Sequence, residues 1–531
     1  AERFYFASAD APLDRSEYLL IVPKEIELQL DARGPVKADG GREVPEPEIR
    51  TQGDERLYFY VRQKVPRMIP EAPMDAALLD DWMPSIRVGA GLSFPRYVNY
   101  LRERRYRALR LSRELRALAA EVAGPASVAA GTDEPAASLI ARASRLDAWV
   151  RKNIRSGGSI DEQATSILAR REGRRDVLLL ALLRAAGIPA EAWLVRSQSG
   201  PHLDGPLPDI LAYNELIVAV APGRGDAGGP LLWLDPMYRH LPSGYVRPAL
   251  RGGRALRLPE TGLSPPVQTA SFTTVNLPPD GGTSAAYAAA LGGAAAKPGA
   301  TDGQPASPPQ VLRDQRRLAL TMKLGADGSG EVTVRETLTG WPALEWREQV
   351  ENIAEEKLRQ QIEQRALGFY FPGASLLDLK YGPMDNDTAE LTVEYRFRAP
   401  RLGRSRRSAG GTELVLPAPY PLLLGRSYLS MARRRTPLML HYALPTVLDA
   451  QIDLPAGARV AQLAAPLQLT DFGQFTQKVT QAVTAQGERL LLHTETSLPL
   501  TRLLPDRYPR FAEFATRIDA AEEAIAVLTL P

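Results

Sequence analysis

The fold of this chain is decided by the stretch Arg170-Arg171-Glu172-Gly173-Arg174-Arg175-Asp176, which runs directly into Val177-Leu178-Leu179-Leu180-Ala181-Leu182-Leu183-Arg184-Ala185-Ala186-Gly187-Ile188-Pro189-Ala190. After the polar turn, leucines recur on almost every side of a helical wheel, which is typical of a helix buried in the centre of a domain. Gly187 and Pro189 end the helix, because glycine favours a helix C-terminus and proline cannot continue one. The pattern therefore predicts a central helix over residues 176–186.

This stretch resembles the core of the transglutaminase-like superfamily. In that family a Gly-x-Cys-(Lys/Arg)-Asp turn opens a buried helix that ends in Arg-Ala-(Ala/Leu)-Gly-Ile-Pro-Ala, and the cysteine is the nucleophile. Arg174 stands at the cysteine position, and the whole chain contains no cysteine. Because the thiolate is the reacting group of that chemistry, the resemblance implies the fold without its thiol mechanism.

The other two catalytic positions of the family can be located by their local patterns. The family's histidine strand often reads Phe-Asn-His, and this chain has Tyr213-Asn214-Glu215. The family's third residue lies in a Trp-Leu-Asp-Pro-Thr segment, which Trp233-Leu234-Asp235-Pro236-Met237 nearly matches. The resemblance thus implies a degenerate triad of Arg174, Glu215 and Asp235, with Asp176, Asn214 and Trp233 as supporting residues of the pocket.

Two of the three catalytic groups are replaced, and the two substitutes, Arg174 and Glu215, carry charges of opposite sign. An arginine at a helix N-terminus opposes the helix dipole at a cost of about 0.3–1 kcal/mol unless it is compensated. We therefore expect Glu215, together with Asp235, to accept a charge-assisted hydrogen bond from Arg174. The alternative is drift, in which Arg174 points to solvent and Glu215 is an exposed polar residue.

The length of 531 residues and an apolar content of 44% allow several domains, each with its own core. Residues 1–100 show strand-like alternation and predict a β-rich N-terminal domain, and residues 101–264 carry the degenerate transglutaminase-like domain. A Pro/Gly/Ala-rich linker is predicted at 265–312. A β-rich domain with one long helix at about 343–367 follows at 313–435, and a C-terminal β-sandwich-like domain at 436–531.

The expected fold class is therefore α+β and multidomain, with a transglutaminase/cysteine-protease-like α+β core between β-sandwich-like domains. In the core, the helix at 176–186 should pack on an antiparallel sheet that contains residues 212–220 and 231–235. The motifs Leu79-Asp80-Asp81-Trp82-Met83-Pro84 and Arg96-Tyr97-Val98-Asn99-Tyr100 extend the resemblance to a bacterial architecture of this layout. The resemblance also implies that residue 1 falls inside the first β domain.

Composition excludes several classes of function. The 65 Lys and Arg residues exceed the 62 Asp and Glu residues by 3, an excess too small and dispersed to indicate a nucleic-acid partner. The absence of cysteine excludes disulfides, cysteine-ligated zinc and iron–sulfur clusters, and the four histidines lack ligand spacing. We therefore expect no metal and no cofactor. No apolar run approaches the ~20 residues that span a bilayer, so no transmembrane segment is expected.

Three functions remain open after these exclusions. The first, which we favour, is a non-catalytic module that binds a protein, peptide or cell-wall component. The second is an unconventional hydrolase that uses the Glu215 and Asp235 carboxylates as acid and base. The third is a structural subunit of an envelope assembly. Relatives of this architecture are typically exported, so the resemblance implies a periplasmic or cell-envelope location and protein or peptide partners there.

Overall fold

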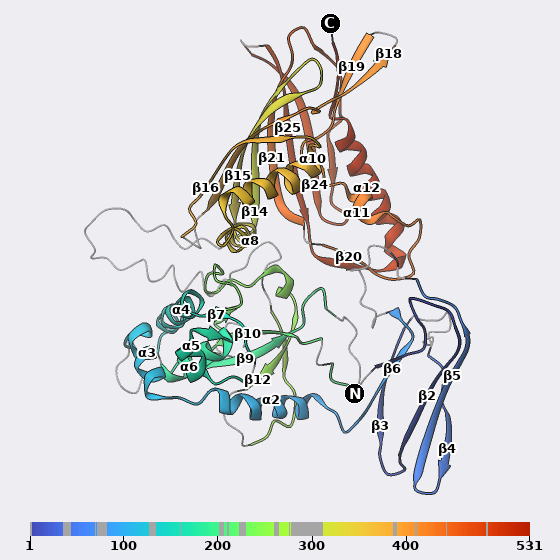
Figure 1. The fold of residues 1–531 in the computed structure, drawn as a ribbon, viewed down its shortest axis with the longest axis vertical. Helices are drawn as coiled ribbons and strands as arrows, with labels where there is room; N and C mark the ends of the chain where they lie inside the picture. The colour runs from blue at the N-terminus through green and yellow to red at the C-terminus, as the bar shows by residue number, and fades with distance from the viewer. Residues whose placement is uncertain are drawn as a thin grey trace. The chain divides into compact units, whose positions relative to one another are not determined.

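A computed structural model of the chain describes residues 3–530 apart from 35–43, 70, 72–81, 127–133, 160, 201–206, 210–211, 222–229, 260–264, 276, 278–311, 386–389, 409–410, 442 and 485–486. The chain forms two compact units, the first built mainly from Ala1–Leu277 and the second from Val311–Arg433 and Leu440–Pro531. Helices and several sheets occur in both (Figure 1), so the protein is α+β and multidomain. The segment Leu79–Asp81 of the quoted motif lies outside the described residues.

The N-terminal part of the first unit consists of two three-stranded antiparallel sheets, with strand orders β1-β6-β3 and β2-β5-β4. Their alternating side chains place Phe6, Tyr58, Tyr60 and Ile86 in one core. This part of the chain is β-rich, as predicted. The strands are β1 (Arg3–Tyr5), β2 (Leu13–Pro23), β3 (Leu28–Arg33), β4 (Glu48–Gln52), β5 (Glu55–Val65) and β6 (Ser85–Ala90).

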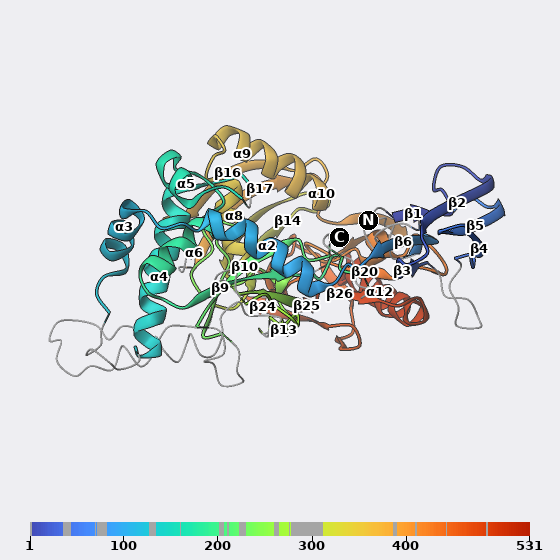
Figure 2. The same cartoon turned by 90° about the horizontal axis from the view of Figure 1, so that it is seen from below.

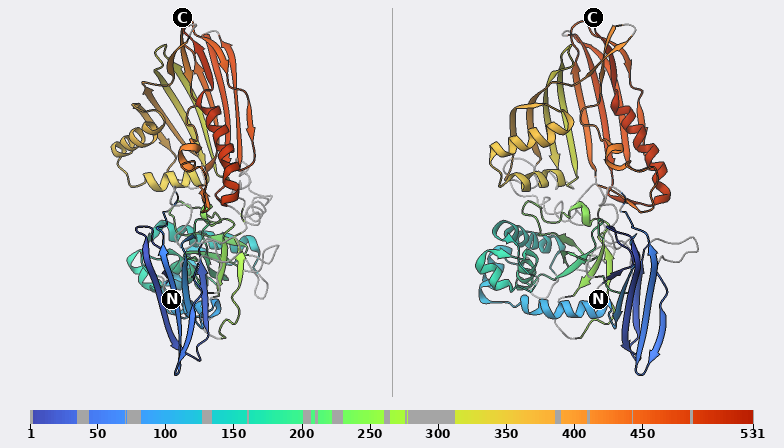
Figure 3. Two further views of the ribbon diagram at one scale, coloured as in Figure 1. Left: turned by 90° about the vertical axis from the view of Figure 1, so that its right-hand side faces the viewer. Right: turned by 45° about the vertical axis from the view of Figure 1, so that its right-hand side comes forward.

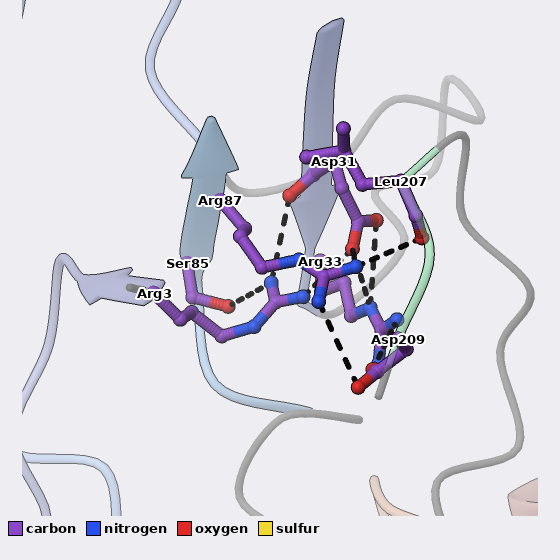
Figure 4. A network of polar contacts seen from close by, with 7 residues as sticks. All are labelled: Arg3, Asp31, Arg33, Ser85, Arg87, Leu207 and Asp209. Carbon is purple, nitrogen blue, oxygen red and sulfur yellow. Dashed lines mark hydrogen bonds and ion pairs between the residues drawn. The ribbon is translucent and has the colours of Figure 1, made fainter. Parts of the chain in front are cut away.

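A buried ion network joins the β1-β6-β3 sheet to the segment that precedes β10 (Glu215–Val220) (Figure 4). Arg33 donates to Asp209 at 3.1 Å, and Arg87 donates to the carbonyl oxygen of Leu207 at 2.9 Å. Asp31 of β3 is opposite Arg87 of β6 in the strand register, and its carboxylate pairs with both arginines. Because the side chain of Arg33 is 1% exposed, these charges are satisfied inside the protein rather than by water.

The rest of the first unit packs helices against a five-stranded antiparallel sheet of order β11-β10-β9-β12-β13. Figure 2 shows the long helix α2, which leads from the N-terminal strands to α3. The helices are α2 (Phe94–Ala108), α3 (Arg113–Ala123), α4 (Ala136–Asn153), α5 (Ala164–Arg170) and α6 (Arg175–Ala185). The other elements are β7 (Arg155–Ser156), β8 (Glu172–Gly173), β9 (Ala190–Val195), β11 (Leu232–Leu234), the short 3-10 helix η2 (Pro248–Leu250), β12 (Arg254–Leu258) and β13 (Phe272–Thr274).

Helix α6 is the centre of this fold, as the sequence predicts. Each residue from Val177 to Leu183 is at most 3% exposed, and these side chains share one core with the neighbouring helices and the sheet. Full burial of a leucine side chain contributes about 1.5–3 kcal/mol, so this helix is a main source of stability for the unit. The predicted packing of the helix on an antiparallel sheet is therefore what the structure has.

The two faces of the five-stranded sheet pack against different parts of the chain. Leu194, Leu216 and Leu234 belong to the core that contains α6. Trp193, Ile217 and Trp233 belong to a second core together with Val246 and Leu250. Since residues two apart in a strand share a face, Glu215 and Asp235 lie at the sheet edge on the side of the second core.

The second unit is organised around one eight-stranded sheet of order β16-β17-β15-β14-β21-β25-β24-β23. Figure 3 shows α12 along one side of these strands and α8–α10 at the other side. A four-stranded sheet of order β18-β19-β27-β22 contributes Leu414 and Leu528 to the same core. The strands are β14 (Gln315–Leu324), β15 (Gly330–Thr339), β16 (Ser375–Gly382), β17 (Leu391–Ala399), β18 (Arg404–Ser408), β19 (Gly411–Leu416), β20 (Leu438–Leu440), β21 (Ala443–Asp453), β22 (Arg459–Leu463), β23 (Leu467–Leu469), β24 (Gln474–Thr484), β25 (Gly487–Leu498), β26 (Thr501–Leu503) and β27 (Ala526–Thr529).

The predicted domain boundary at 435/436 is wrong. Strand β14 pairs in parallel with β21 over Arg316–Lys323 and Thr446–Asp453, so the two predicted domains share one sheet. A parallel pairing between strands more than 100 residues apart leaves no local signal in the sequence. The predicted linker also begins too early, because Phe272–Thr274 forms β13 and pairs with β12; most of the remaining linker lies outside the described residues.

The predicted long helix at 343–367 is broken into several helices. It consists of α8 (Trp341–Val350), α9 (Glu355–Gln361), a π-helical turn (Ile362–Leu367) and α10 (Gly368–Tyr370). The break occurs at residues 351–354, where Ala354 adopts an extended conformation before α9. Val350 before the break and Leu358 after it both belong to the core of this unit, so the two helices bury apolar residues in the same core on either side of the break. The remaining helices of the unit are α11 (Leu424–Tyr428), the 3-10 turn Pro505–Arg507 and α12 (Tyr508–Glu523).

Candidate functional site

The site lies where α6 begins. Arg174 is the N-cap residue of α6, and its side chain makes no capping hydrogen bond. Strands β7 and β8 pair in parallel and bring Ser156 beside Gly173. Gly173 has a φ of 145°, and a Cβ atom there would come within 2.6 Å of Ile167, so only glycine fits this position without displacement. The glycine of the turn therefore lets two short segments meet at the helix N-terminus.

Arg174 forms an ion pair with Asp176 of its own helix, at 2.7 Å between Nε and Oδ1. The carboxylate of Asp176 is also 3.5 Å from Nη1 of Arg105, which α2 contributes and whose side chain is 1% exposed. Asp176 itself is 5% exposed. Its negative charge in the first turn of α6 compensates the unfavourable effect of Arg174 on the helix dipole.

Arg175 anchors the helix start to the segment after β11. Its Nε donates to the carbonyl oxygen of Ile154 at 2.8 Å, and its Nη1 donates to that of Met237 at 2.8 Å. These bonds hold the chain after Asp235 beside the N-terminus of α6. A cavity of about 190 Å³ remains between these segments, and its lining residues are Ser156, Gly157, Gly158, Arg174, Arg175, Asp176, Leu216, Pro236 and Met237.

Glu215 and Asp235 are held by a different arginine. Arg247 donates from Nη2 to Glu215 at 2.5 Å, and its Nε is 3.2 Å from Oδ2 of Asp235. The side chain of Arg247 is 8% exposed, that of Asp235 is 0% exposed and that of Glu215 is 26% exposed. Burial raises the pKa of the Asp235 carboxyl above its ordinary value, while the neighbouring Arg247 guanidinium acts in the opposite direction.

The structure thus shows a different ion pairing from the one that the sequence led us to expect. Arg174 pairs with Asp176 instead of Glu215 or Asp235, and Arg247 bridges those two carboxylates. The physical reason is that Asp176 lies only two residues from Arg174 in the same helix turn, while Arg247 already pairs with both carboxylates. Arg174 is also only partly exposed, with 30% of its side chain accessible, so it does not simply point to solvent.

The segments that carry the candidate residues do meet at one edge of the sheet. Residues 174–176, Leu216 and Pro236 line a single cavity, and Arg247 joins Glu215 to Asp235. Trp233 is buried behind this edge and contacts Trp193 edge to face, with ring centroids 5.7 Å apart. Asn214 is exposed at the start of β10.

The sequence analysis missed two arginines that organise the site. Arg247 lies in the loop before β12 and Arg105 lies in α2, both far from the quoted motifs. A weak signal did exist, because two carboxylates at the ends of neighbouring strands require a cation nearby. The sequence holds 65 basic residues, however, and nothing in their spacing selects these two.

Neither a metal site nor a membrane-spanning helix is found in the part of the chain that the structure describes. No group of three or more His, Asp or Glu residues there is arranged to hold a metal ion. No helix among those residues is both long enough and apolar enough to cross a bilayer.

Comparisons with known proteins support the fold. No protein-family model matches the chain, and no curated protein matches its sequence. Among solved structures, the chain is similar to the crystal structure of a candidate protease from Parabacteroides distasonis, with a TM-score of 0.50 and 12% identity over 99% of this chain and 74% of that one. At this identity the similarity shows a shared fold and nothing about activity.

Proposed function

We propose that this chain is a transglutaminase-like protein that has lost its catalytic cysteine and histidine and acts as a binding or scaffold component of the bacterial cell envelope. The observation that carries the proposal is the ion pairing at the sheet edge. Arg174 occupies the nucleophile position and is held by Asp176, while Arg247 holds both Glu215 and Asp235. No thiol is present anywhere in the chain to perform the family's reaction.

The alternative, a hydrolase that uses Glu215 and Asp235, has less support. The side chain of Asp235 is 0% exposed, so it cannot reach a substrate in solution without rearrangement. Both carboxylates also contact the same guanidinium, whereas an acid and a base must act on separate atoms of a substrate. The description of the structural neighbour as a protease applies to that protein, and at 12% identity it does not support a hydrolase activity of this chain.

A single introduced thiol tests whether Arg174 occupies a degenerate nucleophile position. Since the chain has no cysteine, Arg174→Cys carries one thiol only, and Val483→Cys, at a residue that is 81% exposed, is the matched control. The helix N-terminus and the neighbouring Arg175 should lower the thiol pKa below its ordinary value of about 8.5. Alkylation by iodoacetamide as a function of pH measures it. Equal titration of the two variants would contradict the proposed ancestry of the site.

Partner binding is tested by affinity capture with crosslinking from envelope extracts of the native host. The wild-type chain is compared with Arg174→Ala, in which Arg105 still neutralises Asp176, and with Arg184→Ala, an exposed arginine at the opposite end of α6. Partners that Arg174→Ala loses and Arg184→Ala retains would support binding at the α6 pocket. Equal recovery by all three proteins would move binding elsewhere, and peptide hydrolysis by the purified wild type would overturn the non-catalytic assignment.

A further inference from the structure

The positive charge of the chain is concentrated in one segment, which covers α2 and the start of α3. Residues 96–116 contain eight arginines and two glutamates, a net charge of +6, although the whole chain carries only +3. The other residues together therefore carry a net charge of −3. A local excess of one sign, on a chain that is slightly acidic elsewhere, indicates a surface that meets an acidic partner.

Four of the eight arginines have partners within the fold. Two of them donate to backbone carbonyl oxygens and two pair with carboxylates; the four are Arg96, Arg102, Arg104 and Arg105. The structure of the first unit itself accounts for these residues, so they are not available to a partner.

The remaining four arginines form an exposed surface that we call the basic corner. Its residues lie at the end of α2, in the connection that follows and in the first turns of α3: Arg107, Arg110, Arg113 and Arg116. All four are exposed, and none of their side chains forms an ion pair or a hydrogen bond with a described residue. The acidic residue within residues 107–116 is Glu114, so the corner keeps a net charge of +3.

Helix stability does not explain the position of this charge. Arg113 is the first residue of α3, where the helix dipole disfavours a positive charge. The side chain of Ser112 already caps this helix by accepting a hydrogen bond from the backbone N–H of Leu115. Arg110 precedes the same N-terminus. Because the fold gains nothing from these two charges, they point to a partner outside the unit.

Two exposed tyrosines of α2 adjoin the basic corner. Tyr106 is 40% exposed and precedes Arg107, and Tyr100 is 51% exposed. Tyr100 and Arg107 are seven residues apart and therefore share one face of the helix. Figure 2 shows α2 in front of the other elements of the first unit, where it leads into α3. Tyrosine rings have an apolar body and a polar hydroxyl, which suit the boundary between lipid headgroups and hydrocarbon.

We propose that the basic corner binds the surface of a membrane that contains anionic phospholipids. Each arginine close to such a surface favours binding by about fivefold, and guanidinium forms paired hydrogen bonds with phosphate oxygens. Tyr100 and Tyr106 add amphipathic surface beside the charges, which favours a lipid surface over an acidic protein. The proposal is independent of the function proposed for the α6 pocket, because no residue of the basic corner lines that pocket.

Cosedimentation of the purified chain with vesicles tests the proposal. The probes are vesicles of phosphatidylcholine with phosphatidylglycerol and vesicles of phosphatidylcholine alone. We expect binding to the anionic vesicles at low salt and release at about 1 M salt, where the Debye length falls to about 3 Å. Replacement of all four arginines of the basic corner by glutamine should weaken binding at least about fiftyfold.

The matched control removes the same charge from the second unit. It replaces four exposed arginines there by glutamine: Arg335, Arg365, Arg398 and Arg517. This variant should retain most of the binding, because these arginines lie outside the basic corner. Circular dichroism and thermal melting confirm that each variant is folded. If the variant of the basic corner fails to fold, Arg110→Gln/Arg116→Gln is compared with Arg335→Gln/Arg365→Gln.

A fluorescent label locates the contact. Because the chain has no cysteine, Ala117→Cys provides a single thiol at an exposed residue next to Arg116, and Val483→Cys provides one in the second unit. Each thiol is labelled with a nitrobenzoxadiazole fluorophore, which brightens in apolar surroundings. Anionic vesicles should brighten the label at position 117 and change the label at position 483 much less.

Three results would overturn the proposal. The first is equal binding to the two kinds of vesicle. The second is equal loss of binding in the two variants that lack four arginines, which would reflect net charge alone. The third is binding of poly-glutamate as tight as that of anionic vesicles, with no brightening of the label at position 117, which would indicate an acidic protein as the partner.

Discussion

Arg247 is the residue on which the geometry of the sheet edge depends. Its guanidinium is the cation that faces both Glu215 and the fully buried Asp235. Removing one partner of a buried ion pair destabilises a protein strongly, because the remaining charge is then buried without a counter-charge. The arginine should therefore contribute strongly to the stability of the first unit, although it lies outside every motif that identifies the fold.

Replacement of Arg247 by methionine should lower the free energy of unfolding of this unit by about 3–5 kcal/mol at pH 7. The second substitution in Arg247→Met/Asp235→Asn should recover part of the loss, because it removes the buried negative charge. Urea unfolding followed by tryptophan fluorescence measures both, since Trp193 and Trp233 lie in the adjacent core. An Arg247→Met variant as stable as the wild type would show that the ion pairs of Arg247 with Glu215 and Asp235 do not stabilise the unit.

Glu522 should make the second unit sensitive to pH. It lies in the last turn of α12, is 5% exposed and accepts a hydrogen bond from the backbone N–H of Leu422 at 2.9 Å. Burial, with a smaller contribution from nearby Asp519, raises the pKa of Glu522 from 4.5 to about 8. The folded state therefore binds this proton more tightly than the unfolded state, and stability should fall as pH rises from about 4.5 to about 8.

We expect this loss to amount to roughly 2–5 kcal/mol and to disappear in Glu522→Gln, which stays neutral. Glu523→Gln is the matched control, because the side chain of Glu523 is 70% exposed. Hydrogen exchange of the peptide that contains Leu422, measured across this pH range, follows the local effect. An equal pH dependence in the Glu522→Gln variant and the wild type would contradict the assignment.

At the scale of single elements, the position of the central helix could be predicted more easily than features that depend on tertiary packing. The central helix α6 was predicted from its leucines alone, because a helix that is buried on all sides has apolar residues on every face. The break between α8 and α9 was not predicted, because residues 351–354 contain no proline or glycine to mark it. The two predicted strands at the site, β10 and β11, were located by the same motifs that supplied Glu215 and Asp235.

Strand β21 joins the two halves of the eight-stranded sheet. Gln451 is exposed, and its position pairs with Thr321 of β14 on one side and Leu491 of β25 on the other. Proline at this position removes a backbone donor from a central strand, so Gln451→Pro should destabilise the unit by about 3 kcal/mol or more. Hydrogen exchange should accelerate in β14 and β25 together. Gln451→Ala keeps the backbone donor and loses only an exposed side-chain hydrogen bond from Arg489, so it should change exchange in both strands far less. Faster exchange confined to one half would contradict a shared sheet.

At the scale of the whole molecule, the chain has fewer compact units than its composition suggested. The sequence predicts four domains and a linker, whereas the described residues form two units. Composition marks where the chain is rich in proline and glycine, but it does not show which strands pair after a long loop. The buried Arg33–Asp209 pair also joins the N-terminal strands to the rest of the first unit, and it links residues 176 positions apart (Figure 4).

Local sequence was enough to predict the α+β class and the central helix with its glycine and proline end, and it shows that the chain contains no cysteine. These properties depend on local hydrophobic periodicity and on residue identity, which need no knowledge of distant contacts. The pairing of Arg174 with Asp176 and the bridge from Arg247 to Glu215 and Asp235 could be read only from the three-dimensional arrangement of the side chains. Charge partners are selected by which side chains the fold brings within a few ångströms in a buried setting, and a chain with 65 basic residues offers too many candidates for the sequence to choose.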